Sequence, residues 1–300
     1  MTLALGLDVG GSTTRAVVVS ASGSVLGSAR GPGANPVVYG EAAVSTIAAA
    51  VRQAVADLRV EASVMGIAGG LGGFDGDFAR MWASLGVPPP RLVSDVELAF
   101  VSGTASRTGS VLLAGTGAAA SHVVDRVAVA TADGHGWLLG DLGSGVWLGR
   151  EAVRHLLTTI DQASSGGLLA ARVLEGLFGE PRPMTRETAS EAIHRVHAAP
   201  VPTLASLAPL VLAAAEHDPH AADILDRAAA HLQETLATVR PKDDDSPIVL
   251  AGGLLAQGSP LAARLPYPTI THAGDAARAA AWLALHDLSL DTPHPREVRT

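Results

Sequence analysis

Three glycine-rich segments of this 300-residue chain could hold phosphate groups. The first is Gly6-Leu7-Asp8-Val9-Gly10-Gly11-Ser12-Thr13-Thr14. Its glycines let the backbone turn sharply and bring N–H groups onto an anion, and the hydroxyls of Ser12 and Thr13 add donors. A carboxylate such as Asp8 is costly at the end of a buried strand unless it serves a cation. For this segment alone, the alternative is an ordinary hairpin turn.

The other two glycine-rich segments also follow apolar runs. Gly115-Thr116-Gly117 repeats the pattern of a strand that enters a tight turn, and Gly252-Gly253 lets a flat ligand or a helix approach closely. Taken alone, Gly252-Gly253 is explained as well by tight packing after a strand. Together, two phosphate hairpins and a late Gly-Gly resemble the order found in actin-like ATPases and sugar kinases. That resemblance implies a triphosphate held by backbone N–H groups, hydroxyls and Mg²⁺, with no Walker lysine.

Strands and helices are expected to alternate around these segments. Short runs at 3–9, 16–20 and 25–29 are separated by close turns, which predicts an antiparallel meander. The strand–glycine–strand pattern starts again at 110–124. Further strands are expected at 63–68, 91–94, 127–130 and 247–251, and helices at 41–58, 75–85, 146–160, 168–177, 185–197, 204–216, 221–239 and 275–288. The tail from Asp291 has two prolines and four charges and is expected to be loose.

The repeated opening predicts an α/β protein of two similar domains. With the resemblance, these become two actin-like (ribonuclease H-like) ATPase domains with a cleft between them. The first would cover residues 1–105, with the C-terminal helix (about 275–290) packed back on it. The second would cover residues 106–274 and carry helical insertions.

A short strand places Asp95 at the start of a helix, within Val93-Ser94-Asp95-Val96-Glu97. A helix N-terminus stabilises an anion, so Asp95 is expected to be ionised and positioned rather than strongly basic. The alternative is that Asp95 only caps the helix.

Further segments narrow the resemblance to the N-acetylglucosamine kinases and the BadF/BadG-type ATPases. Gly134-His135-Gly136-Trp137-Leu138-Leu139-Gly140-Asp141-Leu142-Gly143-Ser144-Gly145 resembles their Gly-Trp-Gly…Gly-Asp-Glu-Gly-Ser-Gly/Ala segment. Gly33-Ala34-Asn35-Pro36 resembles their sugar-contacting Gly-x-x-Asn, and Val93 to Ala99 resembles their strand, Asp and helix. The resemblance covers nearly the whole chain in the right order.

The resemblance implies a role for each matching residue. Asp95 matches the catalytic base, which accepts the proton of the sugar 6-hydroxyl. Asn35, Gly136 and Asp141 match residues that bind the sugar, as Asp95 also would. Asp8 matches the support of Mg²⁺, through water. The implied contacts to ATP are Gly10, Gly11, Ser12, Thr13, Gly115, Thr116, Gly117, Gly252 and Gly253.

The chain departs from the family pattern at three positions. Leu142 stands where the family has Glu after the loop Asp, His135 stands in place of the Trp, and Ala119 replaces an Asn common in the animal enzymes. These changes concern the selection of sugar substituents more than the phosphate chemistry. We therefore expect weaker selection at carbon 2 of the sugar.

Composition excludes several other classes of protein. A net charge of −8, no basic run and 3% aromatic residues argue against a nucleic-acid partner. The absence of cysteine excludes disulfides, thiolate metal sites and iron–sulfur clusters, and so a radical-enzyme activator ATPase. Apolar stretches fall short of the ~20 residues of a membrane span, and no signal peptide is evident. A cytoplasmic protein without a membrane partner is expected.

These observations favour an ATP- and Mg²⁺-dependent amino-sugar kinase. It would transfer the γ-phosphoryl group of ATP to the 6-hydroxyl of N-acetylglucosamine or glucosamine. The alternatives are a non-catalytic sugar and ATP sensor, or a kinase of another hexose such as glucose. The expected partners are the sugar and ATP, and a homodimer remains open.

Overall fold

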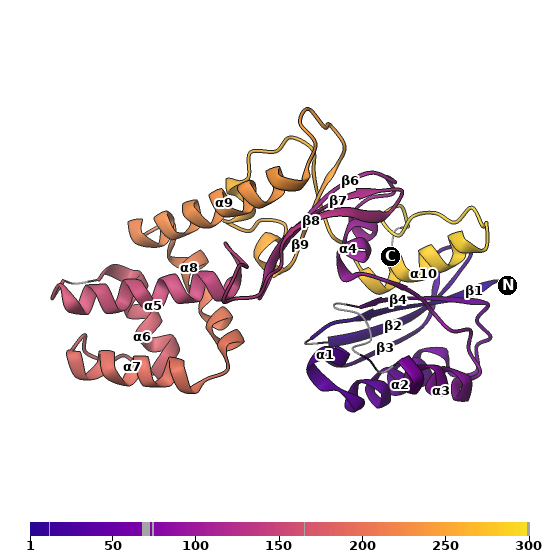
Figure 1. Ribbon diagram of the computed structural model, residues 1–300, viewed down its shortest axis with the longest axis horizontal. Coiled ribbons are helices and arrows are strands. Elements are labelled where there is room, and N and C mark those ends of the chain that lie inside the picture. The colour runs from indigo at the N-terminus through magenta and orange to yellow at the C-terminus, as the bar shows by residue number, and fades with distance from the viewer. Residues whose placement is uncertain (12, 68–72, 74, 165, 299–300) are drawn as a thin grey trace. The chain divides into compact units, whose positions relative to one another are not determined.

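The computed structural model describes residues 1–11, 13–67, 73, 75–164 and 166–298. The chain forms two units, each with its own sheet and core (Figure 1). The first unit consists of Met1–Thr108, Val123–Ala128 and Ala273–Thr300. The second consists of Gly109–His122 and Val129–His272.

The first unit contains a five-stranded sheet in the order β3-β2-β1-β4-β5. Its strands are β1 (Leu3–Val9), β2 (Thr13–Ser20), β3 (Val25–Pro32), β4 (Ala62–Ile67) and β5 (Arg91–Val93). The first three pair antiparallel, as the meander predicted, whereas β4 and β5 run parallel to β1. β1 is apolar and buried along most of its length, as expected for a strand covered on both faces.

Helices cover both faces of this first sheet (Figure 1). They are α1 (Pro36–Tyr39), α2 (Glu41–Val55), α3 (Asp75–Leu85), α4 (Asp95–Gly103) and α10 (Ala276–Asp287). The C-terminal helix α10 packs on β1 and β4. A Cβ on Gly6 would lie 2.1 Å from the carbonyl oxygen of Ala277, so the glycine and the small residues of α10 permit this close approach.

The sheet of the second unit repeats the order of the first. Its strands are β6 (Gly109–Ala114), β7 (Ala118–Val124), β8 (Val127–Asp133), β9 (Ile248–Ala251) and β10 (Ile270–His272). They lie in the order β8-β7-β6-β9-β10, with β9 parallel to β6 and β10 parallel to β9. This shared order confirms the α/β class and the internal repeat expected from the two strand–glycine openings.

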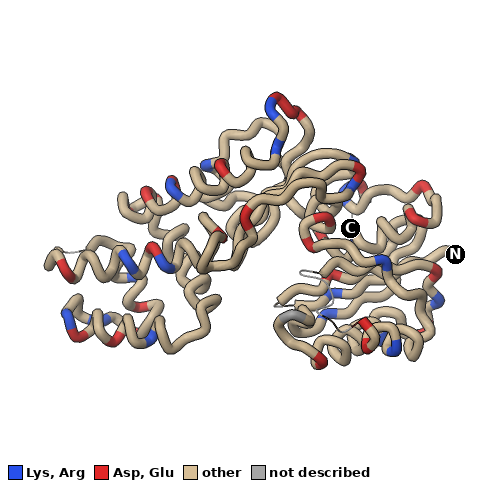
Figure 2. The backbone as a smooth tube through the Cα atoms, viewed as in Figure 1, with Lys and Arg blue, Asp and Glu red and all other residues tan. Residues whose placement is uncertain are grey.

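The second unit packs its helices into a core with this sheet. They are α5 (Gly145–Asp161), α6 (Gly167–Phe178), α7 (Arg186–Ala198), α8 (Ala208–Ala214) and α9 (Pro219–Val239), with 3₁₀ segments η1 (Val201–Leu207), η2 (Gly253–Leu255) and η3 (Ala262–Arg264). The single helix expected at 204–216 is wrong, because η1 precedes a separate α8 that begins around Pro209. Charged residues of both signs occur along α5 and α9 (Figure 2), as in the exposed pair Arg227–Asp223 of α9.

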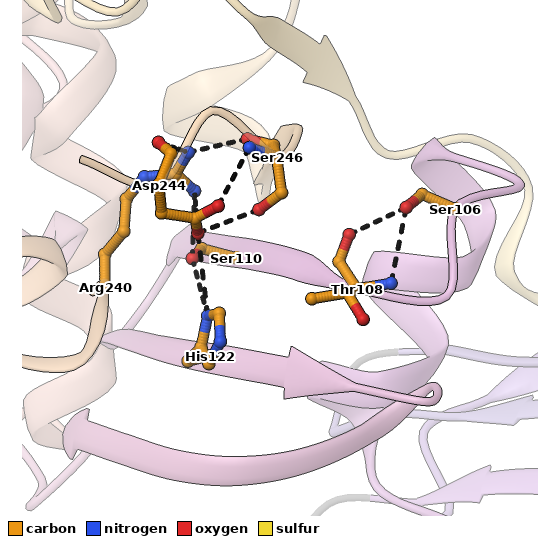
Figure 3. Close-up of polar contacts among 7 residues, drawn as sticks. All are labelled: Ser106, Thr108, Ser110, His122, Arg240, Asp244 and Ser246. Carbon is orange, nitrogen blue, oxygen red and sulfur yellow. Dashed lines mark hydrogen bonds and ion pairs between the residues drawn. The ribbon is translucent and has the colours of Figure 1, made fainter. Parts of the chain in front are cut away.

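A buried polar cluster joins β6 and β7 to the segment that follows α9 (Figure 3). Arg240 Nη1 donates to Ser110 Oγ at 3.1 Å and lies 3.3 Å from Asp244 Oδ2. Its Nη2 donates to the carbonyl oxygens of Asp244 and Ser246, each at 2.6 Å. Ser110 and Asp244 both face His122 Nδ1, at 3.3 and 4.0 Å, and Ser110 is fully buried. This arrangement is therefore a structural clamp rather than a nucleophilic serine site.

The C-terminal tail is anchored, which corrects the expectation that it is loose. His294 is buried, and its Nε2 donates to the carbonyl oxygen of Val101 at 2.8 Å. Arg296 Nη1 donates to the carbonyl oxygen of Gly103 at 2.5 Å. The last carbonyl groups of a helix need donors from outside it, and the tail supplies them to α4.

Candidate functional site

The first glycine-rich segment forms the turn between β1 and β2. The N–H of Gly10 donates to the carbonyl oxygen of Thr13 at 3.0 Å, which closes the turn. The hydroxyl of Tyr39 donates to the carbonyl oxygen of Gly11 at 2.7 Å and holds the turn from outside. Ser12, a predicted phosphate contact, lies outside the described residues. The segment therefore forms a hairpin turn, as the alternative to a phosphate site also predicted. Phosphate binding by its residues remains a prediction.

Asn35, a predicted sugar contact, lies beside this turn. The N–H of its neighbour Ala34 donates to the carbonyl oxygen of Gly10 at 3.1 Å. The carbonyl oxygen of Asn35 accepts from Val38 and Tyr39 and so begins α1. The residue is 8% exposed, and a buried amide requires hydrogen-bond partners. The structure therefore places Asn35 and the first phosphate turn together.

Asp95 opens α4 without capping it. The cap is Ser94, whose Oγ accepts from the N–H of Glu97 at 3.1 Å while Glu97 Oε2 accepts from the N–H of Ser94 at 2.9 Å. This reciprocal pair is a capping box. Asp95 Oδ1 accepts from the N–H of Val96 at 3.0 Å. The alternative that Asp95 only caps the helix is wrong, because Ser94 is the N-cap.

Burial raises the pKa of Asp95 above its ordinary value. The N–H groups of Val96 and of Asp95 itself oppose this rise, and the charge of Glu97 adds to it. Desolvation therefore outweighs the hydrogen bonds to this carboxylate, and the expectation that it is ionised stays a prediction. A carboxylate with a raised pKa is the better proton acceptor.

Asp8 lies at the end of β1, where the charges of two other carboxylates of the first unit act on it. Burial raises the pKa of Asp8, Arg15 lowers it, and the charges of Asp275 and Asp95 raise it further. Asp275 caps α10 through the N–H of Arg278 at 3.1 Å. The sequence marked Asp275 only as the start of a helix. Packing of α10 on β1 brings this third carboxylate to the site, and no local pattern could have revealed it.

Asp8 is the carboxylate here that fits the support of a Mg²⁺ ion. Burial and the charges of Asp275 and Asp95 raise its pKa, and a divalent cation would oppose this rise. Mg²⁺ is usually bound by one or two carboxylates together with waters and substrate phosphates. Within the described part of the chain, no group of three or more His, Asp or Glu side chains could hold a metal ion by itself. A Mg²⁺ ion here would therefore take further ligands from water and phosphate.

The second glycine-rich segment joins β6 to β7 and lies against the start of α5. The N–H of Gly115 donates to the carbonyl oxygen of Gly117 at 2.9 Å, which closes a tight turn. Gly145 donates to the carbonyl oxygen of Gly115 at 2.7 Å, and Val146 donates to that of Thr116 at 3.3 Å. No atom lies within 4 Å of where a Cβ on Gly115 would be. One side of this turn is therefore open to a ligand.

Asp141, a predicted sugar contact, lies against this second turn. Its Oδ1 accepts from the N–H of Ala118 at 3.2 Å, and a Cβ on Gly117 would lie 2.9 Å from its Oδ2. Burial raises the pKa of Asp141 against the opposing N–H of Ala118, and the charge of Asp133 adds to the rise. The N–H of Gly136 stabilises the same carboxylate. Gly117, Gly136 and Asp141 therefore come together in the second unit.

Asp133 organises this loop, a role that the sequence reasoning missed. Its two carboxylate oxygens accept from the N–H groups of Asp141 and Leu142, at 2.7 and 3.0 Å. Asp133 and Asp141 both have positive φ, at 60° and 56°. The Asp133-Gly134 dipeptide is a turn signal that could have pointed to it.

A cavity of about 690 Å³ opens beside the second turn. Ligand sites commonly have this size. Its walls come from the second turn, the start of α5, η1, α8 and the segment after β9, and consist of Gly115, Thr116, Gly145, Ala205, Pro209, Leu212, Ala213, Gly253, Leu254 and Pro260. The structure thus brings together Gly115, Thr116 and Gly253, three of the predicted ATP contacts. The sequence did not identify the walls from η1 and α8, because their side chains are ordinary apolar helix residues.

The two glycines after β9 have different surroundings. Gly252 has φ 90°, and a Cβ there would lie 2.2 Å from the carbonyl oxygen of Ala114. Nothing lies within 4 Å of a Cβ placed on Gly253. The structural explanation therefore applies to Gly252, and contact of Gly253 with a ligand stays a prediction.

A polar cavity of about 640 Å³ lies elsewhere in the second unit, near the starts of α6 and α9. The rings of His155 and His220 lie in it, tilted by 31° with centroids 4.4 Å apart. Asp218 is the N-cap of α9, where it accepts from His220 and Ala221, and it also accepts from Leu169 in the first turn of α6. Its polar groups thus serve the packing of helices.

The model of the BadF/BadG/BcrA/BcrD ATPase family matches residues 5–263 of the chain. The chain belongs to this family. The match confirms the resemblance that the glycine-rich segments and the loop around Asp141 indicated. A comparison with curated proteins found no match.

Solved structures of sugar kinases share the fold of this member of the family. A proposed N-acetylglucosamine kinase from Chromobacterium violaceum is 25% identical, with a TM-score of 0.74 over 94% of this chain and 99% of that one. A second one, from Porphyromonas gingivalis, is 20% identical, with a TM-score of 0.67 over 85% and 87%. A ROK family glucokinase from Streptomyces griseus, solved with glucose and AMPPNP, is 18% identical, with a TM-score of 0.55 over 95% and 99%. The fold is therefore that of the actin-like ATPases and sugar kinases. Among the described residues, none of the helices is long and apolar enough to cross a membrane.

Proposed function

We propose that this ATPase-family protein is a kinase that transfers the γ-phosphoryl group of ATP to the 6-hydroxyl of N-acetylglucosamine or glucosamine. The observation that carries this proposal is the placement of Asp95. Its carboxylate is held at the start of α4, is not the cap of that helix, and has a pKa raised by burial. These are the properties of a group that accepts a proton from a hydroxyl.

The nucleotide is assigned to the cavity and to the two glycine turns. The base would lie between the apolar walls of η1 and α8, with the phosphates toward the turn at Gly115 and Thr116. The turn of Gly10 to Thr13 and the carboxylate of Asp8 would serve the transferred phosphate and Mg²⁺. When bound, Mg²⁺ neutralises charge on the triphosphate.

The proposed transfer forms a bond between the sugar 6-oxygen and the γ-phosphorus and breaks the bond from that phosphorus to ADP. Asp95 takes up the proton that the hydroxyl loses, so the products are ADP and a sugar 6-phosphate. Phosphoryl transfer depends mainly on positioning and charge neutralisation, to which a general base adds about 10²–10⁴-fold.

The amino sugar is assigned from the polar groups of Asn35, Gly136 and Asp141. The likeness to the Chromobacterium violaceum protein, which covers 94% of this chain, supports this class of acceptor. Leu142 and His135 are exposed loop residues, and Ala119 is a small residue of β7. Leu142 and Ala119 have no polar group in place of the Glu and Asn of the family pattern, and His135 has an imidazole in place of the Trp. We therefore expect less contrast between sugars, and some activity with glucose.

The test is kcat/KM for N-acetylglucosamine, glucosamine and glucose with ATP and Mg²⁺, with the product identified by ³¹P NMR. Asp95→Asn should lower kcat by about 10²–10⁴-fold and change KM little. Asp77→Asn, an exposed carboxylate of α3, is the matched control and should behave as the parent chain does. Sugar and ATP binding without transfer would favour the sensor. Transfer only to a different acceptor would contradict the proposed sugar site.

A further inference from the structure

The walls of the nucleotide cavity lack side chains that could distinguish one base from another. Among the described residues that line it, Thr116 has the one polar side chain, and it belongs to the phosphate turn. The rest are glycine, alanine, proline or leucine. Bases differ from each other in the donors and acceptors on their edges. A wall without polar side chains cannot match such an edge.

Four backbone groups of the same walls are engaged within the protein. The N–H groups of Gly115 and Gly145 donate to Gly117 and Gly115, at 2.9 and 2.7 Å. The carbonyl oxygen of Ala205 accepts from the N–H of Ala208, and that of Leu254 accepts from the hydroxyl of Ser259 at 2.5 Å. These backbone groups are therefore occupied and do not select a base.

Selection by shape alone is weak. An apolar pocket separates ligands that differ by one small group by only about 10–200-fold, and it scarcely rejects one that adds a polar group of the same size. By contrast, a site built to hydrogen-bond a ligand rejects an analogue by about 10⁴–10⁵-fold. Adenine, guanine and hypoxanthine share a two-ring frame and differ in polar substituents, so this cavity would hold all three.

We infer that the enzyme accepts purine nucleoside triphosphates in general, and that ATP is one substrate among several. This inference rests on the proposed kinase function. ATP, GTP and ITP should support phosphorylation with kcat/KM values within about 200-fold of one another, which is the most that selection by shape alone gives. CTP and UTP should be poorer, since a single ring fills less of the cavity.

The experiment measures kcat/KM for ATP, GTP, ITP and CTP with the best sugar, and the affinity of the resting protein for ADP and GDP by calorimetry. Ala213→Asn places an amide on an exposed wall position and should change the ATP to GTP ratio. Thr116→Val should weaken all nucleotides in the same proportion and so leave that ratio unchanged.

Purine values within about 200-fold of one another support the inference, and a preference for ATP over GTP beyond about 200-fold overturns it while the kinase assignment stands. If no nucleotide supports transfer, the proposed function fails, and the binding data decide the inference separately. Equal affinity for ADP and GDP would then support it. Binding of ADP alone, or of neither, would overturn it.

Discussion

Replacing Asp95 by asparagine should stabilise the folded chain at neutral pH while it removes turnover. Burial raises the pKa of Asp95 above its ordinary value of 3.8, so the ionised carboxylate is less favourable in the folded chain than in the unfolded one. Between pH 3.8 and the raised pKa, the folded chain binds more protons than the unfolded chain. The free energy of unfolding therefore falls as the pH rises through that window. Asparagine has no charge and escapes this loss.

The size of the gain follows from linkage. Each pKa unit between the folded and unfolded chain corresponds to about 1.4 kcal/mol. In a domain of this size, 1 kcal/mol moves the melting temperature by about 2–4 °C. The substitution removes no stabilising bond, because the amide oxygen of asparagine can still accept from the N–H of Val96. The capping box of Ser94 and Glu97 is also left intact.

Glu97→Ala is the matched control with the opposite sign. The two oxygens of Glu97 accept from the N–H groups of Ser94 and Ala128, at 2.9 and 3.0 Å. Their loss should destabilise the chain by about 1–3 kcal/mol, at about 0.5–1.5 kcal/mol per hydrogen bond. Two acidic residues of the same helical turn should thus give changes of opposite direction.

The assay is thermal unfolding of the parent chain, Asp95→Asn and Glu97→Ala at several pH values from 8 down to about 4. The advantage of Asp95→Asn should be largest near pH 7 and shrink as the pH approaches the ordinary value of a carboxyl group. A lower melting temperature for Asp95→Asn at pH 7, or a gain that does not change with pH, would refute the burial argument.

Three further predictions concern other parts of the fold. Gly252→Ala should destabilise the chain by about 1–3 kcal/mol, because a Cβ at this positive φ would meet the backbone of β6. Gly253→Ala should change stability little and raise the KM for ATP. Calorimetry measures the first effect and kinetics the second. Asp244→Asn weakens the contact with Arg240 and should lower the free energy of unfolding, measured by urea denaturation, by about 1–3 kcal/mol. Burial lowers the pKa of His294, so the stability that it contributes is lost as the pH falls below 6.5; limited proteolysis of the tail should accelerate there.

The glycine-rich segments show what the sequence could predict and what it could not. Their type and order predicted two strand–turn openings, and the repeated strand order and the family match confirm this much. The sequence could not divide the roles within Gly252-Gly253, because both residues are identical and adjacent. Their difference depends on a φ of 90° and on the distance to β6, which only tertiary packing sets.

Asp275 and the C-terminal tail were beyond local patterns for a related reason. The composition of the tail favours a loose segment, yet the carbonyl groups of Val101 and Gly103 at the end of α4 accept from His294 and Arg296. The carbonyl groups that need these donors lie 193 residues earlier in the sequence. Likewise, Asp275 looks like any helix cap until α10 packs on β1.

The position of Asp8 connects the electrostatics of the folded chain with the proposed binding of Mg²⁺. Arg15 favours an ionised carboxylate at the end of β1, but burial, which is the largest effect, and the charges of Asp275 and Asp95 oppose it. A divalent cation that arrives with a triphosphate would reverse each of these opposing effects, since it favours ionised oxygen ligands and screens the carboxylates from one another. If the proposed function holds, binding of Mg²⁺ and nucleotide should stabilise the first unit. Asp8, whose ionised form burial disfavours, is the group expected to support the metal beside the phosphates.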